Sequence, residues 1–402
     1  MTSEWHEVPL RELVGYISKG IAPSYAEEAS ESTIRVLNQK CNRNFRISYG
    51  DSRLHDTRKK KVPPERYVKP DDILINSTGA GTAGRIAQIE DVPSATTIDG
   101  HMILIRSNGK VTQKFLGYAL KAHQWEVLQL DEGSTGQTEL NRDRLLDEIM
   151  INYPVSLDEQ NAIVGTLESI DRKLIVNEQL NDNLEQQAQA IYHERFETVS
   201  PNDMPSEWRI VTLGEVATIS NKSFNPLKEP EILLEHYSIP AFDEARFPVF
   251  ELSTSIKSNK FIIDASCFMI SKLNPTTKRV WKPYCLTGNA VCSTEFIVYK
   301  AKDKTITDFL YSVIDSNSFS DFMCSHVTGS TGSRQRTTPS DTLSYELILP
   351  SEDELAEFQS LVSPMYAQIR INAIENDRLK RLRDSLLPKL MSGEIDVSTI
   401  QL

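Results

Sequence analysis

One stretch near the N-terminus combines the residue types that proteins use to bind nucleic acid. Residues 36–69 carry ten basic and three acidic side chains, and the run 58–61 (RKKK) is the densest part. Arg and Lys attract phosphate, while Arg, Asn and Gln can also form paired hydrogen bonds with purine edges. The alternative interpretation is a solvated loop. The composition favours DNA, with expected contacts from Asn38, Gln39, Lys40, Asn42, Arg43, Arg53, Arg58, Lys59, Lys60 and Lys61.

A weaker set of the same residue types lies in the second half of the chain. Residues 271–290 contain four basic side chains and no acidic one, beside Trp281 and Tyr284. A separate polar cluster precedes them, around residues 221–225. By the same chemistry, we expect DNA contacts at Asn221, Lys222, Lys272, Asn274, Lys278, Arg279 and Lys282.

Two loops of identical length share one beginning. Residues 133–154 and 329–350 both open on Gly-Ser-Thr-Gly and both end on an apolar run closed by Pro. Free backbone N–H groups and small hydroxyls can approach a phosphate closely. A flexible turn before a strand explains the pattern equally well. The candidate contacts in these loops are Ser134, Thr135, Gln137, Ser330, Thr331, Arg334 and Arg336.

The motifs that would indicate catalysis are incomplete. Residues 79–84 read GAGTAG, but a dinucleotide site needs a helix next, and RIAQIE followed by Asp-Val-Pro predicts a strand and a turn. A P-loop would need Lys and a hydroxyl where Arg85 and Ile86 stand. The seven His are scattered, without a Cys/His cluster at metal spacing. We therefore predict a non-catalytic protein with no metal site and a tight Gly-rich hairpin at residues 79–84.

The segments that carry these residues occur twice in the sequence. The start W-x-x-V-x-L-x-E at Trp5 returns at Trp208, the Gly-Ser-Thr-Gly loop returns after 196 residues, and the segment after each terminal Pro returns after 195. Ordered self-similarity of this kind indicates a tandem repeat. Short apolar runs mixed with helical pieces predict two similar α+β domains, residues 1–154 and 200–350. The expected strands include residues 73–75, 102–105, 267–270 and 296–299.

The segments 155–199 and 351–402 are long, polar and periodic. Apolar and Asn residues alternate at spacings of four and three in both, which predicts helices that pack as an antiparallel coiled coil. Asn177 would then face Asn376, and Asn181 would face Asn372; the alternative places these amides at the edge of the seam, in water. We expect a kink at Pro364 and a helix end at Leu387-Pro388. The seam consists of Ile163, Leu167, Ile170, Leu174, Asn177, Asn181, Leu184, Ala188 and Ile191, with Phe358, Val362, Met365, Ile369, Asn372, Asn376, Leu379, Arg383 and Leu386.

The net charge of −12 does not exclude a DNA partner, because it is unevenly distributed. The two helical segments carry −6 and −3, whereas residues 1–154 and 200–350 carry −1 and −2. Five cysteines without a C-x-x-C pair make a disulfide framework improbable and fit a reducing cytoplasm. We expect neither a signal peptide in MTSEWHEVPL nor a membrane-spanning segment.

Taken together, these features resemble the specificity (S) subunit of type I restriction–modification systems. The resemblance is carried by the twin starts, the twin Gly-Ser-Thr-Gly loops, the segment YPVSLDEQNAIVGTLESIDRKLIVN and the C-terminal LLPKLMSGEI. It covers nearly the whole chain. The second copy departs from the pattern, because PSEDELAEFQSLV lacks the Glu159-Gln160 pair of the first copy, which leaves partner contacts there less defined.

The resemblance implies a DNA-recognition function without catalysis. Each domain would read one half of a split, asymmetric site in double-stranded DNA, and the helices would separate the domains. A helix of about 36 residues is about 54 Å long, which spans at most about 16 base pairs. Two methyltransferase subunits and the restriction/translocase subunits would assemble on the chain, and S-adenosylmethionine, ATP and magnesium would be bound by those partners.

Three alternatives remain open from the sequence. The chain could serve another type of methyltransferase or act as a solitary modification enzyme. It could instead be a coiled-coil adaptor that binds only protein. The third, an NAD or nucleotide enzyme, is disfavoured by the strand expected after GAGTAG.

Overall fold

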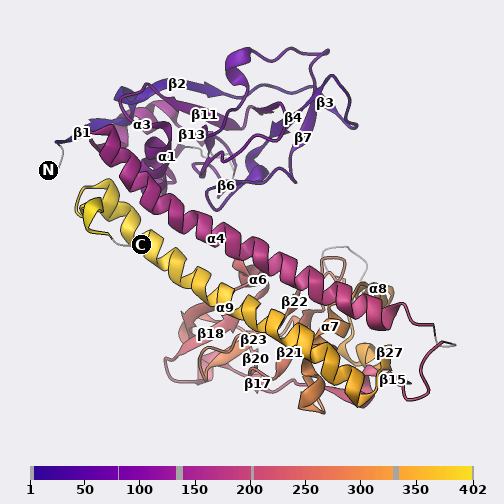
Figure 1. Cartoon of the computed structure of the whole chain (residues 1–402). Coiled ribbons are helices and arrows are strands. Elements are labelled where there is room, and N and C mark those ends of the chain that lie inside the picture. Colours follow the sequence, from indigo (N-terminus) through magenta and orange to yellow (C-terminus); the bar gives the residue numbers. More distant parts are fainter. Residues whose placement is uncertain (1–3, 80, 133–138, 201–202, 329–334, 401–402) are drawn as a thin grey trace. The chain divides into compact units, whose positions relative to one another are not determined.

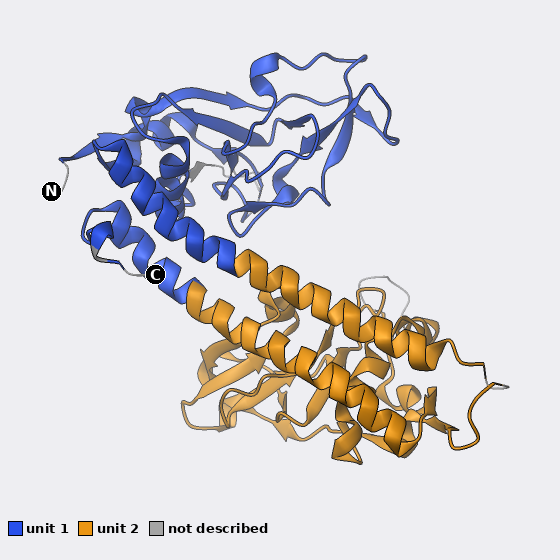
Figure 2. Cartoon of the chain, in the orientation of Figure 1, with its two compact units in different colours: residues 1–173, 380–402 blue, residues 174–379 orange. Residues whose placement is uncertain are grey.

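The computed structural model describes residues 4–79, 81–132, 139–200, 203–328 and 335–400 (Figure 1). It divides into two compact units, residues 1–173 with 380–402 and residues 174–379 (Figure 2). Each unit contains one of the two expected domains and part of each long helix, and the four-part domain division drawn from the sequence stays a prediction. Six expected DNA contacts lie outside the described residues: Ser134, Thr135, Gln137, Ser330, Thr331 and Arg334.

Unit 1 is built on a four-stranded antiparallel sheet in the order β2-β11-β8-β9. Its strands are β2 (Val14–Lys19), β11 (Met102–Ser107), β8 (Ile73–Asn76) and β9 (Ile86–Gln88). The two strands expected from the sequence in this region, residues 73–75 and 102–105, are both present. The GAGTAG segment leads from β8 directly into its antiparallel partner β9. The predicted hairpin is thus confirmed, and a strand stands where a dinucleotide site would need its helix.

A second sheet in unit 1 has the order β10-β4-β7-β3. It contains β10 (Thr96–Ile98), β4 (Thr33–Leu37), β7 (Arg53–Asp56) and β3 (Tyr25–Ala26), and a short hairpin of β5 (Asn42–Arg43) and β6 (Arg46–Ile47) lies in the same segment. The helices of the domain are α1 (Gln113–Ala122), α2 (Gln124–Val127) and α3 (Arg142–Glu148). Most of residues 36–69 therefore lies on or beside this second sheet.

The repeated sequence features pair with each other. The Trp start forms β1 (Trp5–Pro9), which pairs with the Pro-closed strand β14 (Met150–Pro154). In unit 2, β15 (Arg209–Thr212) pairs in the same way with β27 (Glu346–Leu349). Each twin loop is flanked by a short hairpin, β12 (Asp131–Glu132) with β13 (Glu139–Leu140) and β25 (Val327–Thr328) with β26 (Arg336–Thr337). The repeats thus mark the segments that close each domain.

Unit 2 repeats the first sheet strand for strand. The order β16-β24-β21-β22 corresponds to β2-β11-β8-β9, and the expected strands at 267–270 and 296–299 are present. Its strands are β16 (Ala217–Ile219), β24 (Phe296–Ala301), β21 (Cys267–Ser271) and β22 (Val280–Trp281). The second sheet differs, with five strands in the order β17-β20-β23-β18-β19. These are β17 (Ser223–Phe224), β20 (Lys260–Ile262), β23 (Ala290–Ser293), β18 (Leu233–Tyr237) and β19 (Val249–Leu252).

Four shorter helices accompany these sheets in unit 2, and two long helices run through both units. The shorter ones are α5 (Leu213–Val216), α6 (Ile239–Ala245), α7 (Thr307–Ile314) and α8 (Asn317–Ser325). The long ones are α4 (Leu157–Tyr192) and α9 (Glu352–Met391). The two-domain α+β fold with two long helices that the sequence predicts is therefore present.

Contacts within each unit show that α4 and α9 pack antiparallel. In unit 2, Asn177 Nδ2 donates to Asn376 Oδ1 over 2.9 Å, and Asn372 Nδ2 donates to Asn181 Oδ1 over 2.8 Å. As residue numbers rise on one helix, those of their partners fall on the other. Both expected Asn pairs are present, and three of the four amides are buried, with Asn181 partly exposed. The interpretation in which these amides lie in water is therefore wrong.

The predicted end of α9 at Leu387-Pro388 is also wrong, because the helix continues to Met391. A proline within a helix removes one N–H donor and crowds the carbonyl four residues earlier. Asp384, four residues before Pro388, is exposed, so water can solvate its carbonyl group. Two residues beyond Met391 stands Gly393, whose φ of +73° is the left-handed conformation that glycine adopts just after helix ends. Pro364 also lies inside α9, and the kink expected there stays a prediction.

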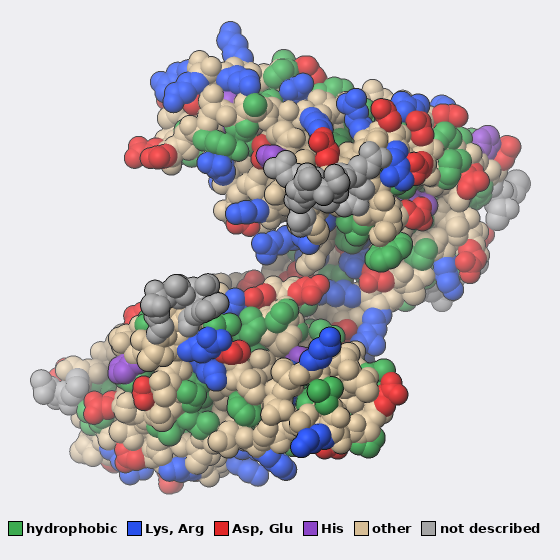
Figure 3. All heavy atoms as spheres, turned by 180° about the vertical axis from the view of Figure 1, so that it is seen from behind, with side chains coloured by type: hydrophobic (Ala, Val, Ile, Leu, Met, Phe, Trp, Pro, Cys, Tyr) green, Lys and Arg blue, Asp and Glu red, His purple; other side chains and the backbone are tan. Residues whose placement is uncertain are grey.

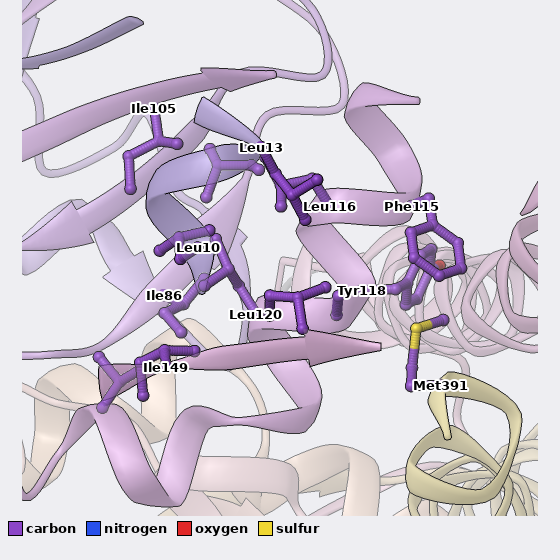
Figure 4. Close-up of a cluster of buried hydrophobic side chains, with 14 of the residues drawn as sticks. Leu10, Leu13, Ile86, Ile105, Phe115, Leu116, Tyr118, Leu120, Ile149 and Met391 are labelled. Atoms are coloured by element: carbon purple, nitrogen blue, oxygen red, sulfur yellow. The ribbon is translucent and has the colours of Figure 1, made fainter. Parts of the chain in front are cut away.

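The helices share the hydrophobic core of each domain. In unit 1, Leu167 from α4 and Leu390 and Met391 from α9 belong to the same buried cluster as the residues of the first sheet and α1. Figure 4 shows Met391 beside Phe115 and Tyr118 of α1, with Leu10, Leu116 and Leu120 deeper in this cluster. In unit 2, Tyr192 and Phe358 join Phe309 of α7 in the corresponding core. Each half of the helix pair is therefore part of a domain rather than a free spacer.

Candidate nucleic-acid interface

The basic run of the first domain is exposed and only partly matched by acidic side chains. Lys59 and Lys61 are exposed in the turn that follows β7. The Arg58 side chain is 74% exposed and contacts Asp56 over 3.3 Å. Its hydrogen bond holds the pKa of Asp56 below the usual value, so this acid stays ionised and offsets only one of the cations. Figure 3 shows Lys and Arg side chains gathered over the end of unit 1 that carries β3, β4 and β7.

Other basic side chains of the same segment extend this surface. Lys40 and Arg43 are exposed on the segment that follows β4. On β7, the Arg53 guanidinium lies over the Tyr25 ring, 3.4 Å from its centroid. A guanidinium stacked on an aromatic ring keeps its N–H donors available at the edge. We call the set Lys40, Arg43, Arg53, Arg58, Lys59 and Lys61 the cationic surface.

Several expected contacts in this segment also form hydrogen bonds within the domain. Asn42 is buried, and its Nδ2 donates to Asn76 Oδ1 and to the Arg85 carbonyl oxygen. Asn38 caps a short helical turn and donates to the Asp51 carbonyl oxygen. Lys60 donates to the Ala22 carbonyl oxygen over 2.9 Å. A sequence pattern does not separate these amides from surface ones, because Asn is equally suited to capping and to base contact.

The expected basic residues of the second domain are paired with acids. Lys278 contacts Asp315 over 3.1 Å, and Arg279 forms two hydrogen bonds with Asp243, of 2.6 and 2.8 Å. Lys282 pairs with Asp308, and Arg336 forms two hydrogen bonds with Glu295. The acids that pair with Lys278, Arg279 and Lys282 come from α6, α7 and the segment after α7, outside residues 271–290. This is why the local sequence predicted a charge excess that the fold removes.

The remaining expected contacts of the second domain have mixed environments. Asn221 and Lys222 are exposed, and Lys272 is half-buried. Asn274 adopts a left-handed conformation with φ of +48°, and its Oδ1 is buried without a hydrogen-bond partner. Asn274 thus shapes the turn between β21 and β22 instead of presenting its amide group at the surface.

The fold brings together two segments of each domain that the sequence does not link. In unit 1 the loop after β8 forms a β-bridge with β13, through Thr78 and Glu139. In unit 2 the loop after β21 forms the corresponding bridge with β26, through Leu273 and Arg336. These segments are about 60 residues apart in sequence, so no local motif marks the contact. The repeat itself is the signal, because both bridges join the same two positions of the duplicated fold.

Two classes of site can be assessed across the described residues. No group of His, Cys, Asp or Glu among them has the geometry to hold a metal ion. None of the helices in the described part of the chain is long and apolar enough to cross a membrane.

Two copies of one α+β domain, each sharing its core with part of a helix pair and one bearing a cationic surface, form the arrangement expected of a tandem DNA-recognition protein. Residues 2–186 match the family model of the type I restriction modification DNA specificity domain. The matched segment is therefore similar to the DNA specificity domain of type I restriction–modification systems, the family that the sequence features resemble. The matched segment covers the first domain and most of α4, and the second domain repeats its first sheet.

Known proteins similar to this chain are consistent with that assignment. The type I restriction enzyme MjaIX specificity subunit of Methanocaldococcus jannaschii is 25% identical over 335 residues, 76% of this chain and 74% of that protein. The type I restriction enzyme HindI specificity subunit of Haemophilus influenzae is 33% identical over 93 residues, 23% and 20% of the two chains. The crystal structure of a type I S subunit from M. genitalium has the same fold, with a TM-score of 0.58 at 16% identity, covering 97% and 96% of the chains.

Proposed function

We propose that this chain is the specificity subunit of a type I restriction–modification system, and that each of its two domains reads one half of a bipartite, asymmetric DNA sequence. The observation that carries this proposal is the duplication of one domain whose loops and basic side chains differ between the copies. Two domains that recognise different DNA sequences need the same fold and different contact residues. The cationic surface of the first domain supplies the phosphate contacts that bind and position DNA, and the continuous helices α4 and α9 set the spacing of the half-sites.

The test is to exchange residues 1–154 for the corresponding domain of another specificity subunit. The hybrid is expressed with its methyltransferase, and the modified sequences in the host genome are determined. We expect one half of the methylated sequence to change and the other half and the spacing to stay. A change in both halves, or in neither, would contradict the two-reader proposal.

We propose further that two methyltransferase subunits dock on the helix pair. In unit 2, Val176, Leu180 and Ile371 expose large apolar side chains, between 40% and 55% accessible. Glu185 bonds Arg246 and Tyr366 bonds Ser312, so these two helix positions face the domain. Val176 lies nine residues before Glu185, half a turn away around the helix, and Ile371 lies about 140° from Tyr366. The apolar side chains thus point away from the domain, as a protein-binding surface requires.

Replacing Val176 and Ile371 with Asp tests this surface. We expect the double variant to fold but to co-purify with less methyltransferase, because charged groups would have to be desolvated in the complex. The matched control is Glu178→Gln on α4, a polar replacement on the same helix. If the wild type, the double variant and the control recover equal amounts of methyltransferase, the docking surface must lie elsewhere on the chain.

The chain itself is proposed to be non-catalytic and to act in the cytoplasm. Restriction/translocase subunits complete the assembly, and S-adenosylmethionine, ATP and magnesium belong to the partner subunits. A protein-only adaptor is the competing proposal, and a complex without salt-dependent DNA binding would favour it.

A further inference from the structure

We propose that base specificity in each domain is set by four corresponding positions, which we call the variable edge. This inference rests on the proposed function and assigns residues to it. The positions are Lys19, Thr78, His101 and Glu139 in unit 1, and Asn221, Leu273, Glu295 and Arg336 in unit 2.

Strand register establishes that three of these positions correspond. Met102 pairs with Asn76 in unit 1, and Phe296 pairs with Ser271 in unit 2. His101 and Glu295 immediately precede the first residue of each of these pairs, and Thr78 and Leu273 follow the second by two residues. The β-bridges of Thr78 with Glu139 and of Leu273 with Arg336 then match the third position.

The fourth position follows from the edge strand of the same sheet. Lys19 lies opposite Ile103 on β11. In unit 2, Ile219 lies opposite Tyr299, so the place opposite Ile297 falls on Asn221, two residues beyond the end of β16. Asn221 was expected to contact DNA from its composition alone, whereas Lys19 has no basic neighbours in the sequence and was missed.

In unit 1 the edge is a connected polar cluster. Thr78 Oγ1 lies 2.8 Å from His101 Nδ1, and it also lies 3.4 Å from Gln39 Oε1. Lys19 forms an ion pair with Glu139. In unit 2 the same place holds two parallel hydrogen bonds from Arg336 to Glu295, of 3.0 and 3.1 Å, beside the apolar Leu273. Equivalent positions of one fold therefore offer opposite charges and different donors.

The exposure of these side chains leaves them available to a ligand. The side chains of Lys19, Glu139 and Arg336 are 44%, 56% and 43% accessible, and Glu295 is 29% accessible. Ion pairs this exposed contribute little to stability, so packing alone does not explain them. Their chemistry suits base edges, since Arg pairs with guanine O6 and N7 and Glu accepts from the cytosine amino group. The edge also includes a residue of β13 in unit 1 and of β26 in unit 2, which are strands of the short hairpins.

The test uses the complete complex of the chain with its methyltransferase. Glu139→Gln and His101→Gln alter the first edge, and Arg336→Gln and Glu295→Gln alter the second. The methylated genomic sequences and competition binding between cognate and single-base-changed duplexes are measured. We expect the first pair to relax one half-site and the second pair the other, with discrimination at the affected base reduced about fivefold or more.

Two matched controls distinguish base reading from general damage. Glu148→Gln removes the charge of an exposed acid paired with Arg144 in unit 1, and Asp243→Asn does the same beside Arg279 in unit 2. Both controls should modify the wild-type sequence. Thermal unfolding of each variant identifies any that lose the fold, and the second variant of the same edge then decides the outcome for that domain.

The possible failures are distinguishable. A wild-type complex whose methylated sites are not bipartite would overturn the proposed function. A bipartite wild type together with folded edge variants that keep the same sequence and the same discrimination would overturn the variable edge alone. Relaxation of both half-sites by variants of one edge would also overturn it.

Discussion

The two domains share a frame and use charge in opposite ways. The first domain carries an exposed cationic surface, while a largely buried ionic cluster joins α1 to α4 and α9. That cluster centres on Asp171, which accepts hydrogen bonds from Tyr118, Lys121 and Arg383 at 2.9, 3.1 and 2.9 Å. In the second domain the reader's cations are paired with acids. The helix position equivalent to Asp171 holds Tyr366, whose hydroxyl bonds Ser312.

This difference shows that charge counted along a sequence is not charge presented by a fold. Residues 271–290 contain basic residues only, yet three of them meet acids from other elements. Within residues 36–69, by contrast, Arg58 pairs with Asp56 while Lys59 and Lys61 are exposed. We therefore expect the first domain to dominate the salt-dependent part of DNA binding, and the second to depend more on base contacts.

The largest expected effect comes from breaking the Asp171 cluster. Asp171→Asn leaves Lys121 and Arg383 buried beside a neutral group, and removing one partner of a buried ion pair costs about 3–5 kcal/mol. The matched change in unit 2, Tyr366→Phe, removes one neutral hydrogen bond and should cost about 1 kcal/mol. Urea unfolding with hydrogen exchange resolved to each unit measures both. Equal losses would mean that the two helix positions contribute alike despite their different chemistry.

The stabilities of the two units should depend on pH in opposite directions, because the pKa values of their acids are shifted in opposite directions. Burial raises the pKa of Asp171, but Lys121 and Arg383 more than offset this, so the net pKa lies below its usual value. Its stabilisation is present above about pH 4 and is lost as pH falls through the lowered pKa. In unit 2, burial raises the pKa values of Glu185 and Asp315. Protonation of these acids favours the folded state, so unit 2 gains stability as pH falls through those raised values.

Unit-resolved hydrogen exchange from pH 7 down to about pH 2, below the usual pKa of Asp, measures this contrast. We expect protection in unit 1 to decrease relative to unit 2, and Asp171→Asn to reduce the pH dependence of unit 1. A parallel change in both units, with wild type and variant alike, would contradict the assignment.

The next largest effect is expected on DNA affinity and its dependence on salt. Replacing Arg58, Lys59 and Lys61 with Ala removes up to three phosphate contacts, which lowers the slope of log K against log salt by about 2.7. At physiological salt this is about a hundredfold in affinity. The matched triple change in unit 2, Lys278, Arg279 and Lys282 to Ala, should leave the slope nearly unchanged because those cations are paired. Filter binding of the assembled complex across salt concentrations measures both slopes. A larger decrease in slope from the triple change in unit 2 would contradict the dominant role of the first domain.

The sequence predicted the parts of the fold that repeat or follow a local period. The strands at 73–75 and 296–299, the Gly-rich hairpin and the Asn pairs each depend on neighbours at fixed spacing, and the copies reinforced one another. The end of α9 was predicted too early because proline usually ends a helix. Here the carbonyl group that Pro388 leaves without its helical hydrogen bond belongs to the exposed residue Asp384, so water can solvate it. The site was predicted less well. Asn42 is buried by a contact with Asn76, and Arg279 is neutralised by Asp243; both depend on elements that only the tertiary fold brings together.

The smallest expected effect concerns α4 and α9, the corresponding helices of the two copies, which pack against each other. Replacing both Asn177 and Asn376 with Leu exchanges a buried amide hydrogen bond for apolar contact, and we expect the double variant to be about 1 kcal/mol more stable or to lose its fixed register. Either single change removes the hydrogen bond between the two amides and should destabilise, although Asn177 keeps its bond to Glu375 and Asn376 keeps its bond to the Leu174 carbonyl oxygen. A double-mutant cycle in urea unfolding gives the coupling energy, and a value near zero would contradict an energetic role for the pair. Asn181 and Asn372 provide the matched cycle. Because Asn181 is only partly buried, its coupling should be the weaker of the two.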